Sequence, residues 1–130
     1  MRPPFVSIMS GRAVAGARVA LVRARRLDHL WTIDRTLLVA VDDYSTPAAA
    51  QRRLVDMETA AVVRLASMEA GTLRFTVATN AQMPDTREAY LRVGSTVWTM
   101  YLATGHPGES PSDRELKAVL TVVAARVPNG

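Results

Sequence analysis

Cysteine is absent from this sequence of 130 residues, which excludes a disulfide framework, a thiolate nucleophile and any metal site with cysteine ligands. The only two histidines are His29 and His106, so a histidine-rich metal site is excluded as well, and no cofactor is expected. No apolar run approaches the roughly 20 residues that span a bilayer. Arg12 and Arg18 interrupt the early apolar stretches that a signal peptide would need. The chain as written is therefore expected to be cytoplasmic, and to belong to the cell envelope or be secreted if its start is misassigned.

Acidic residues are absent from residues 1–26, which carry six arginines. The whole chain has 16 basic and 12 acidic residues, which leaves ten basic against 12 acidic residues after Arg26. An asymmetry of this kind is typical of contact with nucleic acid or an anionic surface. The favoured interpretation is a solvated, arginine-rich lead-in or edge strand. The alternative is a nucleic-acid-binding segment that uses Arg18, Arg23, Arg25 and Arg26.

Hydrophobic residues make up 48% of the chain and charged residues 22%, which is ordinary for a globular protein. The length suits a single domain. Residues 1–12 contain Pro3, Pro4 and Gly11 without apolar periodicity, so they are expected to form a loose N-terminal lead-in. Residues 13–130 are expected to form one domain.

Four stretches favour β-strands. Residues 17–25 are compatible with a strand or a short helix, and we favour a strand. Residues 31–44 place Trp31, Ile33, Leu37, Val39 and Val41 on one parity, which is typical of a half-buried strand, with an irregularity near Arg35. Residues 73–77 alternate in the same way. Residues 88–102 are expected to form one strand whose second half is apolar on both parities, which indicates a central strand covered on both faces or a contact in a homodimer.

Two helices are predicted. Thr46 and Pro47 are typical of an N-cap followed by a first helical residue. After them an apolar stripe at helical spacing predicts a helix of about six turns that ends at Gly71; it comprises Ala50, Leu54, Met57, Ala61, Leu65 and Met68. The segment 110–113 predicts a second cap, and the apolar positions from Leu116 to Val127 predict a terminal helix stopped by Pro128.

These elements predict an α+β domain with an antiparallel sheet of about four strands and two amphipathic helices, in the order β-β-α-β-β-α. Paired strands separated by single helices favour packing of both helices on one face of the sheet.

Candidate catalytic groups are few. Gly11 and Gly16 have the spacing of a phosphate-binding loop, but Ala17 and Arg18 stand where that loop needs lysine and a hydroxyl residue, so this motif is rejected. Asp42 and Asp43 could act as paired carboxylates, although a strand end beside a helix N-terminus is the favoured interpretation. We interpret both histidines as loop residues, and no catalytic or metal-binding residue is assigned. The aromatic residues, Trp31, Tyr90, Trp98 and Tyr101, are expected to pack in the core or an interface rather than to stack on bases.

The segment from Thr36 to Leu54, Thr-Leu-Leu-Val-Ala-Val-Asp-Asp-Tyr-Ser-Thr-Pro-Ala-Ala-Ala-Gln-Arg-Arg-Leu, resembles a strand-to-helix unit of small extracytoplasmic domains of actinobacteria. Such domains occur in lipoproteins and in the sensor regions of membrane-anchored Ser/Thr kinases. The segments Tyr90–Trp98 and Pro111–Val127 resemble the closing strand and helix of the same domains. The resemblance implies an α+β module that binds a ligand or a partner at the cell envelope, without catalytic residues.

The leading hypothesis is therefore a non-enzymatic domain that binds a protein or a small ligand. A nucleic-acid-associated protein is the alternative, and an enzyme is the least favoured of the three classes.

Overall fold

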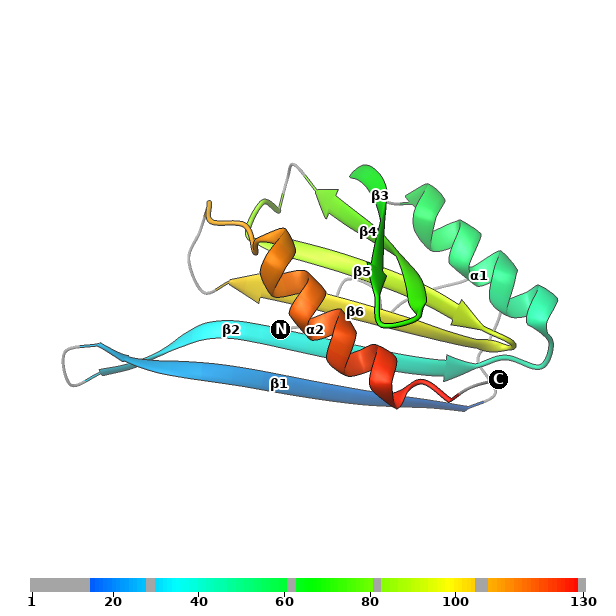
Figure 1. Cartoon of the computed structure of the whole chain (residues 1–130), viewed down its shortest axis with the longest axis horizontal. Coiled ribbons are helices and arrows are strands. Elements are labelled where there is room, and N and C mark those ends of the chain that lie inside the picture. Colours follow the sequence, from blue (N-terminus) through cyan, green and yellow to red (C-terminus); the bar gives the residue numbers. More distant parts are fainter. Residues whose placement is uncertain (1–14, 28–29, 61–62, 81–82, 105–107, 129–130) are drawn as a thin grey trace.

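The computed structural model describes residues 15–27, 30–60, 63–80, 83–104 and 108–128, without the side chains of residues 15, 19–34, 63 and 80. The elements follow one another as β1 (Ala15–Leu27), β2 (Leu30–Asp43), α1 (Pro47–Ala60), β3 (Val63–Ala70), β4 (Leu73–Asn80), β5 (Thr86–Val93), β6 (Thr96–Thr104) and α2 (Asp113–Arg126). The strands form one sheet of six in the order β1-β2-β6-β5-β4-β3 (Figure 1). Every pairing is antiparallel, so the predicted α+β class with an antiparallel sheet is correct.

The prediction of about four strands in the order β-β-α-β-β-α is wrong, because the observed order is β-β-α-β-β-β-β-α. The first error lies in residues 63–70, which the apolar stripe assigned to a helix. Helix α1 ends at Ala60, and β3 pairs with β4 along its whole length, from Val63 with Asn80 to Ala70 with Leu73. The ladder satisfies the backbone groups on the side of this edge strand that faces β4, and pairing with β4 prevails over the helical spacing. Gly71 is therefore a hairpin residue with φ of +61° and does not cap a helix.

The second error lies in residues 88–102, which were expected to form one strand. They form the hairpin of β5 and β6, in which Val93 pairs with Thr96 and Gly94 turns the chain with φ of +61°. Only glycine adopts such a φ without steric cost, so Gly94 marks the turn. The prediction of a central strand is confirmed for β6, which lies between β2 and β5.

The two helices pack on opposite faces of the sheet, which corrects the expectation of a single covered face. Residues of α2 share a core cluster with Ala89 and Leu91 of β5, whereas residues of α1 share a second cluster with Tyr90. Neighbouring strand residues point to opposite faces, so the alternation along β5 separates the two clusters. We refer to the two sides as the α1 face and the α2 face.

Several local predictions are confirmed. The amide of Ala49 donates to Thr46 Oγ1 at 3.0 Å, so Thr46 caps α1. The amide of Glu115 donates to Ser112 Oγ at 3.1 Å, so Ser112 caps α2. The irregularity expected near Arg35 is a bulge. Arg23 of β1 pairs with Arg35 and Ala24 pairs with Ile33, so that Asp34 lies between two paired residues of β2.

Candidate functional site

The N-terminal part of α2 is fixed to the sheet by two ion pairs. Arg35 on β2 donates to both carboxylate oxygens of Glu115, with Nε at 2.6 Å and Nη2 at 3.1 Å. Arg87 on β5 pairs with Asp113 in the first helical turn. The Arg87 side chain is 9% exposed, whereas Asp113 is 80% exposed. The Arg35–Glu115 pair is bidentate and therefore geometrically specific, and together with the Arg87–Asp113 pair it holds α2 on its face.

Helix α2 crosses the sheet obliquely and leaves part of β2 uncovered on the same face (Figure 1). Leu37, Val39 and Val41 of β2, together with Trp98 of β6, are only half-buried. They form the floor of a groove of about 500 Å³ between α2 and the outer strands, and Ala17 of β1 lies at its margin. Its size is within the range of small-molecule sites.

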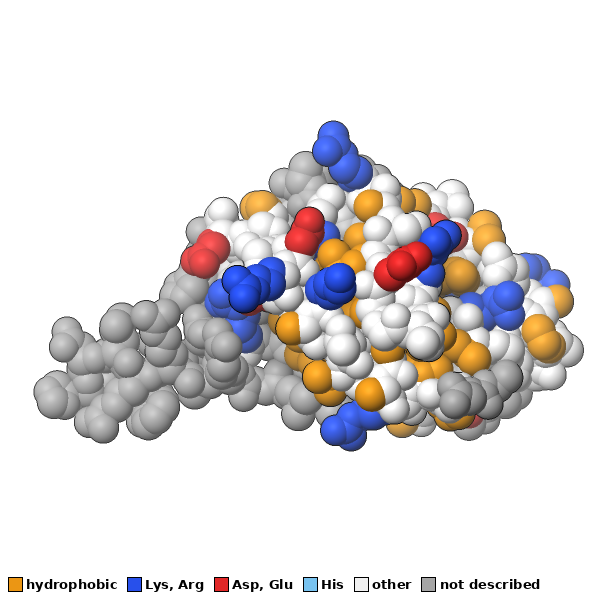
Figure 2. Space-filling model, viewed as in Figure 1, with side chains coloured by type: hydrophobic (Ala, Val, Ile, Leu, Met, Phe, Trp, Pro, Cys, Tyr) orange, Lys and Arg blue, Asp and Glu red, His pale blue; other side chains and the backbone are white. Residues whose placement is uncertain are grey.

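The helical wall of the groove is a single stripe of α2. Val119, Val122, Val123 and Arg126 line it, at the spacing i, i+3, i+4 and i+7 that shares one helix face. Val123 is buried, whereas Val122 is 57% exposed. Figure 2 shows this side of the molecule, where apolar side chains reach the surface between charged ones. The exposed apolar surface on this wall is available to a partner or ligand.

The groove continues toward the β5–β6 turn. A second hollow of about 380 Å³ shares Val41 and Trp98 with the first and reaches Gly94, Asp43 and Pro128. Asp43 accepts a hydrogen bond of 2.6 Å from Thr96 Oγ1. The groove thus has an apolar middle, an arginine on its helical wall and an acidic end.

The α1 face differs in chemistry, because all three tyrosines of the chain lie there. Tyr44 and Tyr90 belong to its core cluster, and Tyr101 is 2% exposed. The Tyr90 hydroxyl donates to the Glu88 carboxylate. Burial, and then the charge of Glu88, raise the pKa of Tyr90 far above its ordinary value. Burial also raises the pKa of Tyr101, with the charge of Asp85 adding to it. These phenols are closed into the core.

The residues proposed as paired carboxylates point to opposite faces. Asp42 accepts a hydrogen bond of 2.7 Å from Arg18 Nη1, whereas Asp43 accepts one from Thr96 across the next strand. Since consecutive strand residues alternate in direction, the structure separates the two groups. Within the described ranges, no group of three or more His, Asp or Glu side chains could hold a metal ion.

The four arginines of the nucleic-acid alternative all belong to β1, which is an edge strand. Arg18 is half-exposed and pairs with Asp42. Arg23, Arg25 and Arg26 lie toward the β1–β2 turn, and the last two lie where β2 no longer pairs with β6. Their side chains are outside the described part of the structure. Charged residues on an edge strand also discourage pairing with other chains, so nucleic-acid binding stays a prediction.

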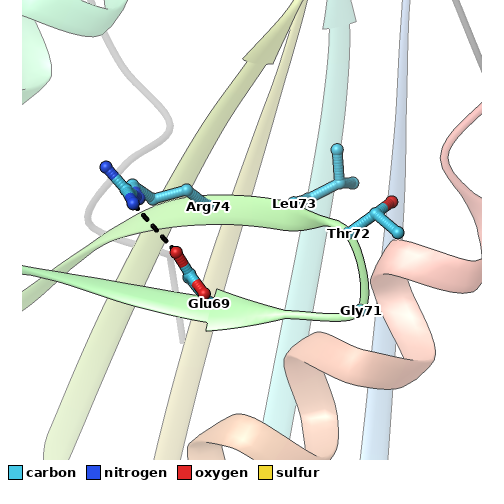
Figure 3. Close-up of a pocket in the computed structure, with 5 residues that line it drawn as sticks. All are labelled: Glu69, Gly71, Thr72, Leu73 and Arg74. Carbon is cyan, nitrogen blue, oxygen red and sulfur yellow. Dashed lines mark hydrogen bonds and ion pairs between the residues drawn. The ribbon is translucent and has the colours of Figure 1, made fainter.

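A third hollow, of about 420 Å³, lies at the β3–β4 hairpin and is lined by Glu69 and residues 71–74. Figure 3 shows Glu69 and Arg74 facing each other across the hairpin, where Arg74 Nη2 donates to Glu69 Oε1 at 2.8 Å. This hydrogen bond, and then the charge of Arg74, lower the pKa of Glu69. Because all its lining residues come from one exposed hairpin, this hollow is a poorer candidate than the groove.

The groove was missed by the sequence analysis, although two of its signals were present. Val122 lies beside the apolar stripe that predicted α2, which widens the apolar surface beyond one buried face. Trp98 was identified as a core or interface aromatic, and it forms part of the groove floor. His29, His106 and the predicted lead-in at residues 1–12 lie outside the described residues.

Fold and groove together define the class of this protein: an α+β domain with one six-stranded antiparallel sheet, a helix on each face and an apolar groove beside the second helix. Comparison of the chain with protein families, with curated proteins and with solved structures found no match. In the described part of the chain, neither helix has the length and apolar content to cross a membrane.

Proposed function

We propose that this chain is a non-enzymatic binding domain, and that the groove between α2 and strands β1 and β2 is its binding surface. The observation that supports this proposal most directly is the apolar lining of the groove, in which Trp98 and three β2 side chains remain half-exposed. Covering apolar surface contributes about 25 cal/mol per Å² to an association. An occupant that fills the groove therefore gains affinity from side chains that are already in position.

The ion pairs of α2 support the same proposal. Arg35 with Glu115 and Arg87 with Asp113 hold the N-terminal part of the helix against the sheet. The helical wall is thereby held at a fixed position relative to the floor. A preformed groove loses less entropy on binding than one that must be assembled.

A matched pair of exposed valines tests the proposal. Val122 lines the groove, whereas Val55 is 45% exposed on α1 and belongs to the opposite side of the sheet. We expect the wild-type protein to bind the neutral apolar dye Nile red. Val122→Glu should weaken that binding about tenfold, because a carboxylate must then be desolvated in the groove, whereas Val55→Glu should leave it unchanged.

Far-UV circular dichroism of both variants checks that the fold is retained. Equal dye affinity for the wild type and Val122→Glu would contradict the proposal, as would a larger loss in Val55→Glu.

The location at the cell envelope that the resemblance implies is a separate proposal. Its test is the mass of the N-terminal peptide of the native protein, measured in membrane, secreted and soluble fractions. A processed or extended N-terminus outside the cytoplasm would support it. An N-terminus at Met1 in the soluble fraction would count against it.

A further inference from the structure

We infer that the groove selects a single-chain amphiphile with an anionic head group, such as a fatty carboxylate, and that Arg126 contacts its head. This inference rests on the proposed function and adds the chemical class of the ligand. It follows from the distribution of charge along the groove, where Arg126 is the only charged side chain among the described residues lining the main hollow.

The apolar floor of the groove runs in the direction of β2. Leu37, Val39 and Val41 succeed one another on one face of the strand, so the floor extends over about 13 Å. Beside it, Val119 and Arg126 are seven residues apart on α2, a rise of about 10 Å. A floor and a wall of similar length suit an extended apolar chain better than a compact polar ligand.

The position of Arg126 sets the orientation of such a ligand. It lies in the last turn of α2, toward the end of the groove where Val41 and Trp98 connect to the second hollow. Among the described side chains it has no ion-pair partner, and it is exposed. The guanidinium can therefore donate two parallel hydrogen bonds to a carboxylate head.

Asp43 places a negative charge at the same end of the groove. Its carboxylate lies in the second hollow and accepts a hydrogen bond from Thr96. An anionic head placed there would be repelled, so the favourable place for it is beside Arg126. A cationic head would be repelled by Arg126 and attracted by Asp43, so the choice of head group depends on which of the two charges the ligand contacts.

A structural role for Arg126 gives a different expectation. A cation in the last turn stabilises a helix by offsetting the partial negative charge of its C-terminus. In that case replacement of Arg126 would lower the stability of the fold without changing the order in which ligands bind. The affinities for chain-matched ligands therefore separate the two roles.

The experiment measures three probes with the same chain length, namely dodecanoate and dodecylammonium below their micellar concentrations and dodecanol below its solubility limit. The readouts are displacement of Nile red and the fluorescence of Trp98 in the Trp31→Phe background, which leaves Trp98 as the only tryptophan. We expect dodecanoate to bind about two- to fivefold more tightly than dodecanol, as for an exposed ion pair. Dodecylammonium should bind more weakly than dodecanoate, and added salt should reduce these differences.

The variants attribute the preference to one side chain. Arg126→Gln should remove the advantage of dodecanoate and leave the affinity for dodecanol unchanged. Arg126→Lys should retain part of the advantage, because a lysine has charge without the planar fork. Arg114→Gln is the matched control, since Arg114 is an exposed arginine of the first turn of α2 and does not line the groove.

Equal affinity for the three probes, or an advantage of dodecanoate that survives in Arg126→Gln, would overturn the inference while leaving the proposed function in place. If neither Nile red nor any of the three probes binds, the proposed function fails together with it. A greater affinity for dodecylammonium would also overturn the inference, because it would place the head group beside Asp43.

Discussion

The two faces of the sheet differ in the side chains that lie beneath each helix. Helix α1 closes over a small cluster in which Tyr44, Tyr90 and Val97 are buried. Helix α2 covers a larger aliphatic cluster and leaves the β2 side of that face half-exposed. The tyrosines of the α1 face are thus buried, whereas the α2 face combines a core with a groove. Helix α2 contributes to both the core and the groove. Leu116 and Leu120 pack in the core, whereas Val119 and Val122 line the groove.

The largest expected effect compares the two cores by truncation. Leu120 is 0% exposed in the α2 cluster, and Met57 is 8% exposed in the smaller α1 cluster. Leu120→Ala should lower the free energy of unfolding by about 2–5 kcal/mol, and Met57→Ala by an amount near the bottom of that range. Urea unfolding monitored by circular dichroism measures both. An equal or larger loss for Met57→Ala would show that the α1 cluster is the principal core.

The next effect concerns the buried arginine that holds α2. Asp113→Ala leaves Arg87 buried without its carboxylate, so we expect a loss of about 1–3 kcal/mol in the free energy of unfolding. Arg87→Met leaves only the exposed carboxylate of Asp113 unpaired, and should cost less. The same urea titration compares the two variants. A greater loss for Arg87→Met would mean that the arginine contributes mainly through its packing.

The pH dependence of stability tests the burial of the tyrosines on the α1 face. In the unfolded chain a tyrosine ionises with a pKa near 10, whereas burial raises the pKa of Tyr90 and Tyr101 in the folded chain. Above pH 10 the folded state therefore binds more protons than the unfolded state, and stability falls as pH rises. The loss approaches about 1.4 kcal/mol per pH unit for Tyr90, Tyr101 adds to it in the same direction, and below pH 10 the full stability is present.

Urea unfolding at pH 9, 10 and 11 measures this slope, and absorbance of tyrosinate in the folded and denatured protein identifies the groups. Tyr90→Phe should reduce the slope. A slope that is unchanged in Tyr90→Phe would mean that Tyr90 ionises normally in the folded chain.

Much of the fold could be predicted from local patterns. The strand that contains the alternating Leu37, Val39 and Val41, the caps at Thr46 and Ser112 and the stripe of α2 all depend on near neighbours in the sequence, and the structure confirms them. Residues 63–70 could not be assigned in this way, because their apolar spacing suits a helix and their partner β4 follows later in the chain. The pairing that decides their structure is a tertiary effect.

The positions of the helices and of the groove depend on the order of the strands in space. The sequence order places β2 before α1, but in the sheet β2 lies next to β6. Only this arrangement brings Val39 and Trp98 to one floor beside Val119. The sequence shows that each of these residues is apolar. That they lie together in one groove could be predicted only with the order of the strands in the sheet.

The smallest expected effect concerns two glycine turns. Gly71 lies against α2, whereas Gly94 lines the second hollow of the groove. Gly71 and Gly94 both have φ of +61°, and a Cβ added at Gly71 would lie 3.3 Å from the Cβ of Ala124 on α2, whereas one added at Gly94 would meet no atom within 4 Å. Gly94→Ala should therefore cost only the backbone strain of about 1 kcal/mol. Gly71→Ala should cost slightly more, because the β3–β4 turn rests against α2. Equal losses in urea unfolding would mean that α2 yields at this contact, so that its position depends on the ion pairs with Arg35 and Arg87 rather than on the hairpin.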